Sequence, residues 1–283
     1  MSDAAYAGRR RVNAAMLALT AACAAVSAGV LLAILAYIAW QGASAIGWSF
    51  LVNLPKPVGE VGGGIANSIV GSIQVVGLAG LIGAPVGALA GVYLAEYGRG
   101  RFAFCVRFAA DVLNGVPSIV VGLFAYALIV MPMKRFSALS GSVALALIMI
   151  PIVLRNTEEF IRLVPGTIRE AALALGVPRW KVTLFVVLPS AGRGILTGAL
   201  LALARVSGET APLIFTAFGN RFWGEGFLSP VATLPHTIYT YAISPYEDWH
   251  RQAWAAALVL MAFVLAVNAA ARVWLKPSRG AAY

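Results

Sequence analysis

Six apolar segments separated by charged stretches constrain this chain more than any other feature. They cover about residues 16–40, 65–94, 112–133, 137–157, 195–218 and 253–275. A helix of about 20 apolar residues crosses the hydrocarbon core of a bilayer, and only the fourth segment has a much shorter clean core. Charged residues make up only 11% of the chain. We therefore expect an all-α polytopic membrane protein with six transmembrane helices.

The distribution of basic residues predicts the orientation. Most of the 21 Lys and Arg residues lie before the first segment or after the second, fourth and sixth. Basic residues are enriched in cytoplasmic loops, so both termini are expected inside the cell. The loops at about 41–64 and 219–252 would then lie outside. Lys134 and Arg135 run against this rule. The net charge of +10 is explained by orientation, and no nucleic-acid partner is expected.

Three glycines in the second apolar segment share one helical face. Gly83, Gly87 and Gly91 are spaced by four residues, which lets two helix backbones approach closely. We therefore expect this helix to pack tightly against a neighbour. The alternative is that these glycines only reflect the general abundance of glycine in membrane helices.

A short helix with strong end signals is predicted between the fourth and fifth segments. Thr167 and Glu170 have the spacing of a capping box, Gly176 is typical of a left-handed stop, and Pro178 prevents continuation. The expected helix covers residues 168–175. Its apolar positions fall on one face, suited to a partner groove or, alternatively, to the lipid headgroups: Ile168, Ala171, Ala172 and Leu175.

Two charged residues lie within the fifth apolar segment, where charge is costly. Arg205 and Glu209 are four residues apart and could pair on one helical face. They would either line a transport path or only fasten helices together. Arg155, at the inner end of the fourth segment, is either a second path residue or an interfacial anchor.

Other titratable residues are expected to have no special role. Glu158 and Glu159 would be solvated or paired with Arg162. His236 and His250 lie in the second exterior loop without metal-ligand spacing and would be ordinary surface residues.

The loop after the fourth segment resembles a known family motif. Glu170-Ala171-Ala172, then Gly176, then Val186-x-Leu188-Pro189 match the EAA loop of ABC importer permeases, with valine in place of the usual isoleucine. The segments GGGIANSIVGSIQVVGLAGL, VYLAEYG, NGVPSIVVGLFAYALIV, LRNTEEFIRLVPGTIREAALALG and ARVSGETAPLIFTAFGN resemble the PstA-type permeases of phosphate importers. The likeness covers about residues 62–220.

The resemblance implies a type I ABC importer permease fold, MetI-like, with a cytoplasmic coupling helix. It divides the chain into a cytoplasmic tail (1–15), a first helix with its exterior loop (16–64), a permease domain (65–275) with a coupling loop at about 158–193, and a second tail (276–283). The protein would be a multi-pass protein of the bacterial inner membrane. The family's charged path residues map onto Arg155, Arg205 and Glu209.

The resemblance also implies partners. A PstC-type permease would pair with this chain, an extracytoplasmic binding protein would deliver inorganic phosphate, and an ATPase dimer would hold ATP with Mg. The chain lacks a G-x-x-x-x-G-K-[ST] loop, so it would bind no cofactor and would not be an enzyme by itself. The residues implied to contact the ATPase are Glu170, Ala171, Ala172, Leu175 and Gly176.

Two alternatives remain at this point. One is an ABC permease for another oxyanion or a phosphonate. The other is a secondary transporter that works alone, which would show inverted repeats.

Overall fold

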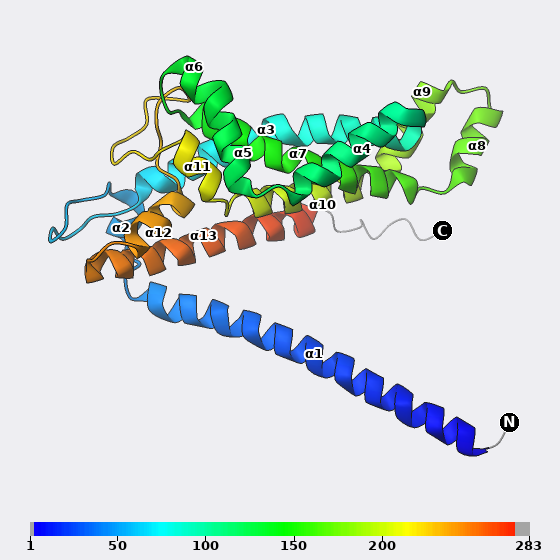
Figure 1. Ribbon diagram of the computed structural model, residues 1–283, viewed down its shortest axis with the longest axis horizontal. Helices are drawn as coiled ribbons and strands as arrows, with labels where there is room; N and C mark the ends of the chain where they lie inside the picture. Colours follow the sequence, from blue (N-terminus) through cyan, green and yellow to red (C-terminus); the bar gives the residue numbers. More distant parts are fainter. Residues whose placement is uncertain (1–2, 275–283) are drawn as a thin grey trace.

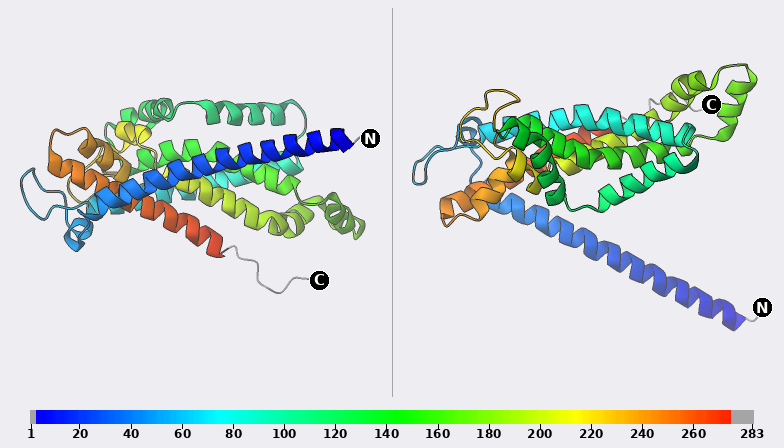
Figure 2. Two further views of the ribbon diagram at one scale, coloured as in Figure 1. Left: turned by 90° about the horizontal axis from the view of Figure 1, so that it is seen from below. Right: turned by 45° about the horizontal axis from the view of Figure 1, so that its top comes forward.

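Long apolar helices form most of the structure, a computed structural model that describes residues 3–274 (Figure 1). The elements are α1 (Asp3–Ala43), α2 (Trp48–Val52), α3 (Ala66–Glu96), α4 (Gly100–Gly115), α5 (Ser118–Ala125), the π-helical turn η1 (Tyr126–Val130), α6 (Met131–Met133), α7 (Ala138–Arg162), α8 (Gly166–Ala174), α9 (Arg179–Val182), the π-helical turn η2 (Thr183–Val187), α10 (Leu188–Val206), α11 (Ala211–Thr216), α12 (Leu234–Ala242) and α13 (Glu247–Trp274). Helices α8 and α9 lie at one end of the molecule, and α2, α6 and α12 lie at the other (Figures 1 and 2). We call these the α8 end and the α12 end.

Five helical stretches are long and apolar enough to cross a membrane by themselves. They are Gly8–Ala43, Ala66–Glu96, Ala138–Arg162, Arg179–Val206 and Glu247–Ala269. A sixth crossing results if the bent pair Gly100–Gly115 and Ser118–Met133 is counted as one span. The expected all-α polytopic fold is confirmed.

The third predicted segment is bent rather than straight. The chain turns by 106° between α4 and α5. Val116, the residue at the break, has extended backbone angles (φ −71°, ψ 130°). Pro117 follows it, and a proline ring disfavours helical geometry in the preceding residue. The apolar run that begins near residue 112 therefore enters its span only at Ser118.

The fifth span begins and ends earlier in the chain than the predicted segment at about 195–218. The helix begins at Arg179 and ends at Val206, and a short separate helix, α11, follows the break. Pro212 stands in the first turn of α11, where its missing N–H needs no partner. Inside a continuous helix it would remove a hydrogen bond and clash with the preceding turn, so the helix cannot continue to residue 218.

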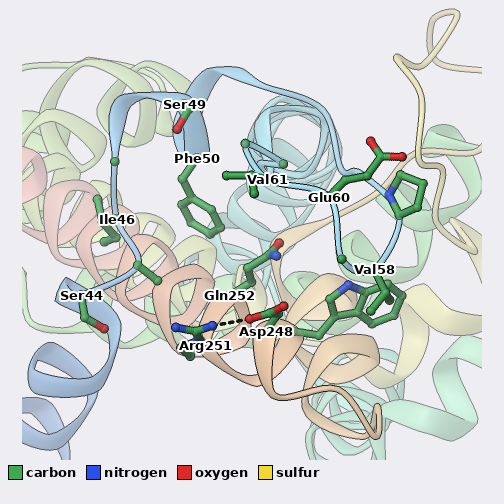
Figure 3. A pocket seen from close by; sticks show the side chains of 17 residues that line it. Ser44, Ile46, Ser49, Phe50, Val58, Glu60, Val61, Asp248, Arg251 and Gln252 are labelled. Carbon is green, nitrogen blue, oxygen red and sulfur yellow. Dashed lines mark hydrogen bonds and ion pairs between the residues drawn. The ribbon is translucent and has the colours of Figure 1, made fainter.

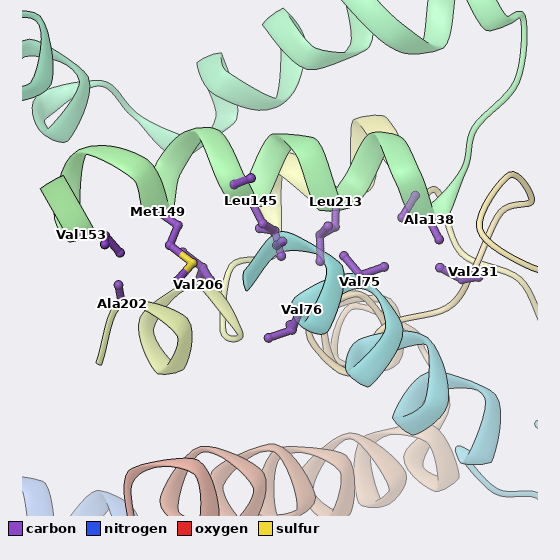
Figure 4. Packing of buried hydrophobic residues seen from close by; sticks show 13 residues of the cluster. Val75, Val76, Ala138, Leu145, Met149, Val153, Ala202, Val206, Leu213 and Val231 are labelled. Atoms are coloured by element: carbon purple, nitrogen blue, oxygen red, sulfur yellow. The ribbon is translucent and has the colours of Figure 1, made fainter. Parts of the chain in front are cut away.

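The core lies where α3, α7, α10 and α11 meet. Figure 4 shows α7 lying across α3, with Leu145 of α7 above the α3 residues Val75 and Val76, and Met149 beside Val206. Val206 and Leu213 complete the cluster from either side of the break after α10. Because both sides of that break are buried in one cluster, the interruption is fixed in place.

The predicted glycine face of α3 is the contact surface for α7. A Cβ at Gly87 would lie 2.8 Å from the carbonyl oxygen of Ile150, and one at Gly91 would lie 2.6 Å from that of Leu154. Separations below 3.0 Å cannot be accommodated by a rigid backbone. The structure thus confirms close packing, and α3 and α7 approach at a distance that only glycine permits.

Helix α1 stands apart from the rest of the bundle (Figures 1 and 2). It meets α13 near its C-terminal end, where Tyr37 and Trp254 stack edge to face with ring centroids 5.3 Å apart. Gly42 also packs directly on the backbone of Trp254. Before this contact the apolar part of α1 is not buried within the chain, so it presents its surface to lipid or to another subunit.

Gly91→Ala should destabilise the protein. The new methyl group would meet the backbone of α7, which cannot move aside without separating the two helices, and overpacking of this kind costs about 1–3 kcal/mol. The matched control is Gly77→Ala on the same helix, where no atom lies within 4 Å of the new methyl group. Thermal unfolding of the purified protein should show a lower Tm for Gly91→Ala alone. Equal Tm values for the two variants would contradict the close contact.

Candidate functional site

Helix α8, which we call the rod, lies at one end of the molecule (Figure 1). Its residues nearly coincide with those of the short helix predicted between the fourth and fifth segments. It covers Gly166–Ala174 rather than 168–175. Gly176 has φ +77°, and its N–H donates to the carbonyl of Leu173 while the N–H of Val177 donates to that of Ala172. This pair of hydrogen bonds is the Schellman arrangement that ends a helix at a left-handed glycine. The predicted stop signal is confirmed.

The predicted capping box is wrong. Pro165 occupies the N-cap position, and no side chain among residues 8–269 caps the helix. Thr167 consequently lies inside the first turn, two residues beyond the cap, where its hydroxyl cannot serve as an N-cap. Pro165 begins the helix earlier because its fixed φ suits the entry into a turn.

Arg169 fastens α8 to the bundle. Its guanidinium donates to Glu96 at the end of α3, with Nε and Nη2 lying 3.0 and 2.8 Å from Oε1. It also donates to the carbonyls of Ile161 and Val164, just before α8. One side chain thus links the rod to α3 and to the C-terminal end of α7. No local pattern in the sequence indicates this link, because Glu96 is 73 residues away.

The two faces of α8 differ in burial. Ala172 packs against a cluster that includes Val164 and Val182. On the open side, Glu170 and Ala171 are exposed, and Leu175, just past the end, is 84% exposed. Of the predicted contact residues, Ala172 therefore belongs partly to the internal packing. The others form an open surface with apolar and acidic character.

A cluster of charges joins α4 to α7 near the α8 end. Glu158 is only 2% exposed, and its carboxylate lies 2.7 Å from Arg107, 2.6 Å from Arg162 and 3.3 Å from Arg155. The predicted pairing with Arg162 is confirmed, but the solvated alternative is wrong. Burying a carboxylate costs the hydration of its charge, and partners of opposite charge are needed to compensate for that loss. Arg107 was missed because it comes from another helix, 51 residues away.

Arg155 is not a free cation. Its guanidinium pairs with Asp111 of α4 as well as with Glu158. The carboxylate of Asp111 is 57% exposed, so this pair lies at the edge of the cluster, toward open space.

Arg205 and Glu209 do not form the predicted pair. Helix α10 ends at Val206, so the two residues no longer share a helical face. No hydrogen bond or ion pair joins them within the part of the chain that the structure describes. Arg205 is exposed in the last turn of α10, and Glu209 is half-buried beyond the break.

The candidate path residues are not brought together. Gly198 of α10 packs against Asn156, the neighbour of Arg155 on α7. Arg155 itself turns toward α4. Arg205 lies seven residues beyond Gly198, about 10 Å farther toward the α12 end at 1.5 Å per residue. The two arginines therefore occupy different levels and different faces of the bundle.

A pocket of about 510 Å³ opens at the α12 end (Figure 3). Its walls come from residues 44–63 and from the start of α13, which are the two loops predicted to lie outside the cell. Phe50 and Gln252 point into it, and Asp248 pairs with Arg251 at its rim. The two loops thus form one continuous surface.

His236 differs from the expected surface residue. It is half-buried in α12, and burial lowers the pKa of its imidazole below the ordinary value. His250 bonds to the carbonyl of Ser244 at 2.6 Å. Among the described residues, no group of three or more His, Cys, Asp or Glu side chains could hold a metal ion.

Comparison with known proteins places this arrangement in a family. Residues 83–277 match the model described as "Binding-protein-dependent transport system inner membrane component". The phosphate transport system permease protein PstA of Yersinia pestis is 44% identical, covering 94% of this chain and 91% of that protein. The protein with the same description in Xylella fastidiosa (strain 9a5c) is 50% identical, covering 83% of this chain and 82% of that protein.

Solved structures of ABC transporters share the fold. A chain of the inward-facing MetNI methionine ABC transporter matches with a TM-score of 0.64 at 16% identity, covering 75% of this chain and 94% of that chain. An amino acid ABC transporter matches with a TM-score of 0.56 at 17% identity, covering 75% and 92%. The expected MetI-like permease fold is thereby confirmed. The matched family model agrees with the apolar spans and with the short helix α8 at one end of the molecule. The chain therefore belongs to the inner membrane components of binding-protein-dependent transport systems.

Proposed function

We propose that this chain is the membrane-spanning permease subunit of an ATP-driven importer of inorganic phosphate. The observation that carries the proposal is the identity of 44–50% to proteins described as phosphate transport permeases, over most of both chains. The complex would contain a second, PstC-type permease, a pair of ATPase subunits that bind ATP with Mg, and an extracytoplasmic phosphate-binding protein. It would lie in the bacterial inner membrane with both termini of this chain in the cytoplasm.

The rod α8 is the proposed contact with the ATPase. Glu170, Ala171 and Leu175 are exposed on its open side, so a partner groove can receive them without disturbing the fold. Movement of the rod would pass through the Arg169–Glu96 pair into α3. Because α3 is in glycine-mediated contact with α7, both helices would move together. This linkage gives the ATPase a mechanical route into the bundle.

Arg205 is the proposed binding residue for phosphate in the path. A guanidinium carries a permanent charge and offers several donors to an oxyanion, which loses its water on entering the membrane. Arg205 has no ion-pair partner among residues 8–269 and is exposed on α10. We assign the open face around it to the path, closed on its other side by the second permease.

Glu209 and Arg155 are proposed to assist Arg205 in the path. Glu209 follows the break after α10 and would screen Arg205 when phosphate is absent. Arg155 would receive phosphate nearer the α8 end, and the substrate would then have to displace Asp111, whose exposed carboxylate occupies that position.

Purification from the native membrane should yield this chain together with an ATPase. After reconstitution in vesicles, uptake of labelled phosphate should require internal ATP and the external binding protein. Unlabelled phosphate should compete, while sulfate or a phosphonate at the same concentration should not. Stronger competition by a phosphonate would assign a different oxyanion, and uptake without ATP would indicate a secondary transporter.

Glu170→Lys should abolish ATP-coupled uptake and leave the subunit folded. Glu170 is exposed, and its carboxylate has no hydrogen-bond or ion-pair partner in the described part of the chain, so charge reversal removes no internal side-chain contact. Glu159→Lys is the matched control, since Glu159 is also exposed near the α8 end but lies outside the rod. Thermal unfolding should be unchanged in both variants. Normal uptake by Glu170→Lys would reject the contact with the ATPase.

Arg205→Gln should reduce phosphate uptake at least about a hundredfold while the complex still assembles, because a charge-assisted contact with the substrate is lost. Arg193→Gln removes an exposed arginine from the same helix and should retain uptake. Transport assays on both variants, with assembly followed by co-purification, provide the measurement. Wild-type uptake by Arg205→Gln would leave Arg205 as a structural residue.

A further inference from the structure

A second concave site lies beside the proposed coupling rod. It has a volume of about 370 Å³ and lies between the C-terminal end of α3, the start of α4, the end of α7, and helices α8 and α9. It is separate from the surface around Arg205, which is near the opposite end of α10. The polar residues in its wall include Glu96, Tyr97, Arg99, Arg162, Arg169 and Arg179.

This pocket has a strong excess of positive charge. Four guanidinium groups line it, and Glu96 is the one carboxylate among its described lining residues. Glu96 is already engaged by Arg169. The pocket is therefore left with about three positive charges that its own wall does not neutralise.

The side chains of two of the arginines make no polar contact within the described part of the chain. Arg99 and Arg179 have neither a hydrogen-bond nor an ion-pair partner for their side chains among residues 8–269. Arg162 reaches Glu158 but remains 58% exposed, and that carboxylate is shared with two further arginines. Like charges held around one cavity repel each other, so these groups gain from an anion bound between them.

The geometry suits a phosphate group. Guanidinium groups recognise phosphate oxygens through pairs of short, charge-assisted hydrogen bonds. The hydroxyls of Tyr97 and Thr183 bond to each other at 3.1 Å in the same wall and offer neutral polar contacts. Basic pockets between membrane helices on the cytoplasmic side bind anionic lipid headgroups by the same chemistry.

We propose that this pocket is a binding site for a phosphate-class anion at the cytoplasmic face, either the headgroup of an anionic lipid or free inorganic phosphate. The site holds the anion between α4 and α9 through Arg99 and Arg179. Arg169 lines the same pocket and also anchors α8, so an anion there adjusts how firmly the rod is held. Binding of the anion in this pocket would therefore regulate the coupling between the ATPase and the membrane helices. This role is distinct from the transport of phosphate through the path.

The test uses the complete transporter, without its binding protein, in lipid nanodiscs. In the first arm the lipid is phosphatidylcholine alone, and inorganic phosphate replaces chloride at constant ionic strength. In the second arm phosphate is absent, and the fraction of phosphatidylglycerol is raised. Tm and basal ATPase rate are measured in both arms.

Three variants separate this pocket from other sites. The pocket variant is R99Q/R179Q. The matched control is R101Q/R193Q, which removes the same charge from exposed arginines outside the pocket. Arg205→Gln tests for binding in the proposed path. If the double variant does not assemble, the single variants Arg99→Gln and Arg179→Gln replace it, each with a smaller expected effect.

A saturable rise in Tm is expected in at least one arm for the wild type, the matched control and Arg205→Gln. The pocket variant should show an apparent affinity at least about tenfold weaker, since charge-assisted contacts are lost. The responding arm identifies the source of the phosphate group, and a response in both assigns the site to that group itself. No response in either arm, or equal responses of the pocket variant and the matched control, would overturn the proposal. Neither result depends on whether phosphate is the transported substrate.

Discussion

The contact between α3 and α7 is the centre of the bundle, because α7 also packs against α4, α5, α10 and α11. Within a bilayer, helices gain little from burying apolar surface, since lipid is equally apolar, and close van der Waals contact takes its place. Gly87 and Gly91 supply that contact by removing the side chains that would keep the two backbones apart. The rod and the charge cluster are attached to this helix pair, whereas α13 packs on α10 and α12, and α1 packs on α13.

Charges in this protein divide into two groups according to their partners. Glu158 with its three arginines, and Glu96 with Arg169, tie helices together at the α8 end. These carboxylates are tolerated away from water because both form ion pairs with arginines. Arg99, Arg179 and Arg205, like the exposed Arg101 and Arg193, have no such side-chain partner among the described residues, and the first three are the arginines for which we propose ligands.

Local signals in the sequence predicted much of this architecture. The spacing of Gly83, Gly87 and Gly91 indicated the tight helix contact, and Gly176 marked the end of the rod correctly. These features depend on residues close together in the chain. The apolar runs also predicted the fold class, because the hydrocarbon core demands helices of a certain length.

The features that the sequence could not predict depend on long-range contacts or on competition between signals. The partners of Glu158 and Glu96 include arginines 51 and 73 residues away, which no periodicity brings together. The chain is apolar on both sides of residues 205–210, and this overall hydropathy predicted one span through residue 218 although Gly208 and Pro212 are residues that interrupt helices. The helix breaks there, so a pairing inferred from helical spacing was lost with the helix.

Helix α1 has a geometric consequence of its own. Its 41 residues make it about 60 Å long at 1.5 Å per residue, yet its packing contact with Trp254 lies near Gly42, at one tip. An arm supported in this way amplifies rotation at its pivot: turning by 10° about Gly42 sweeps the distant tip through about 10 Å. Small adjustments of α13 beneath that pivot would therefore be magnified along the membrane plane.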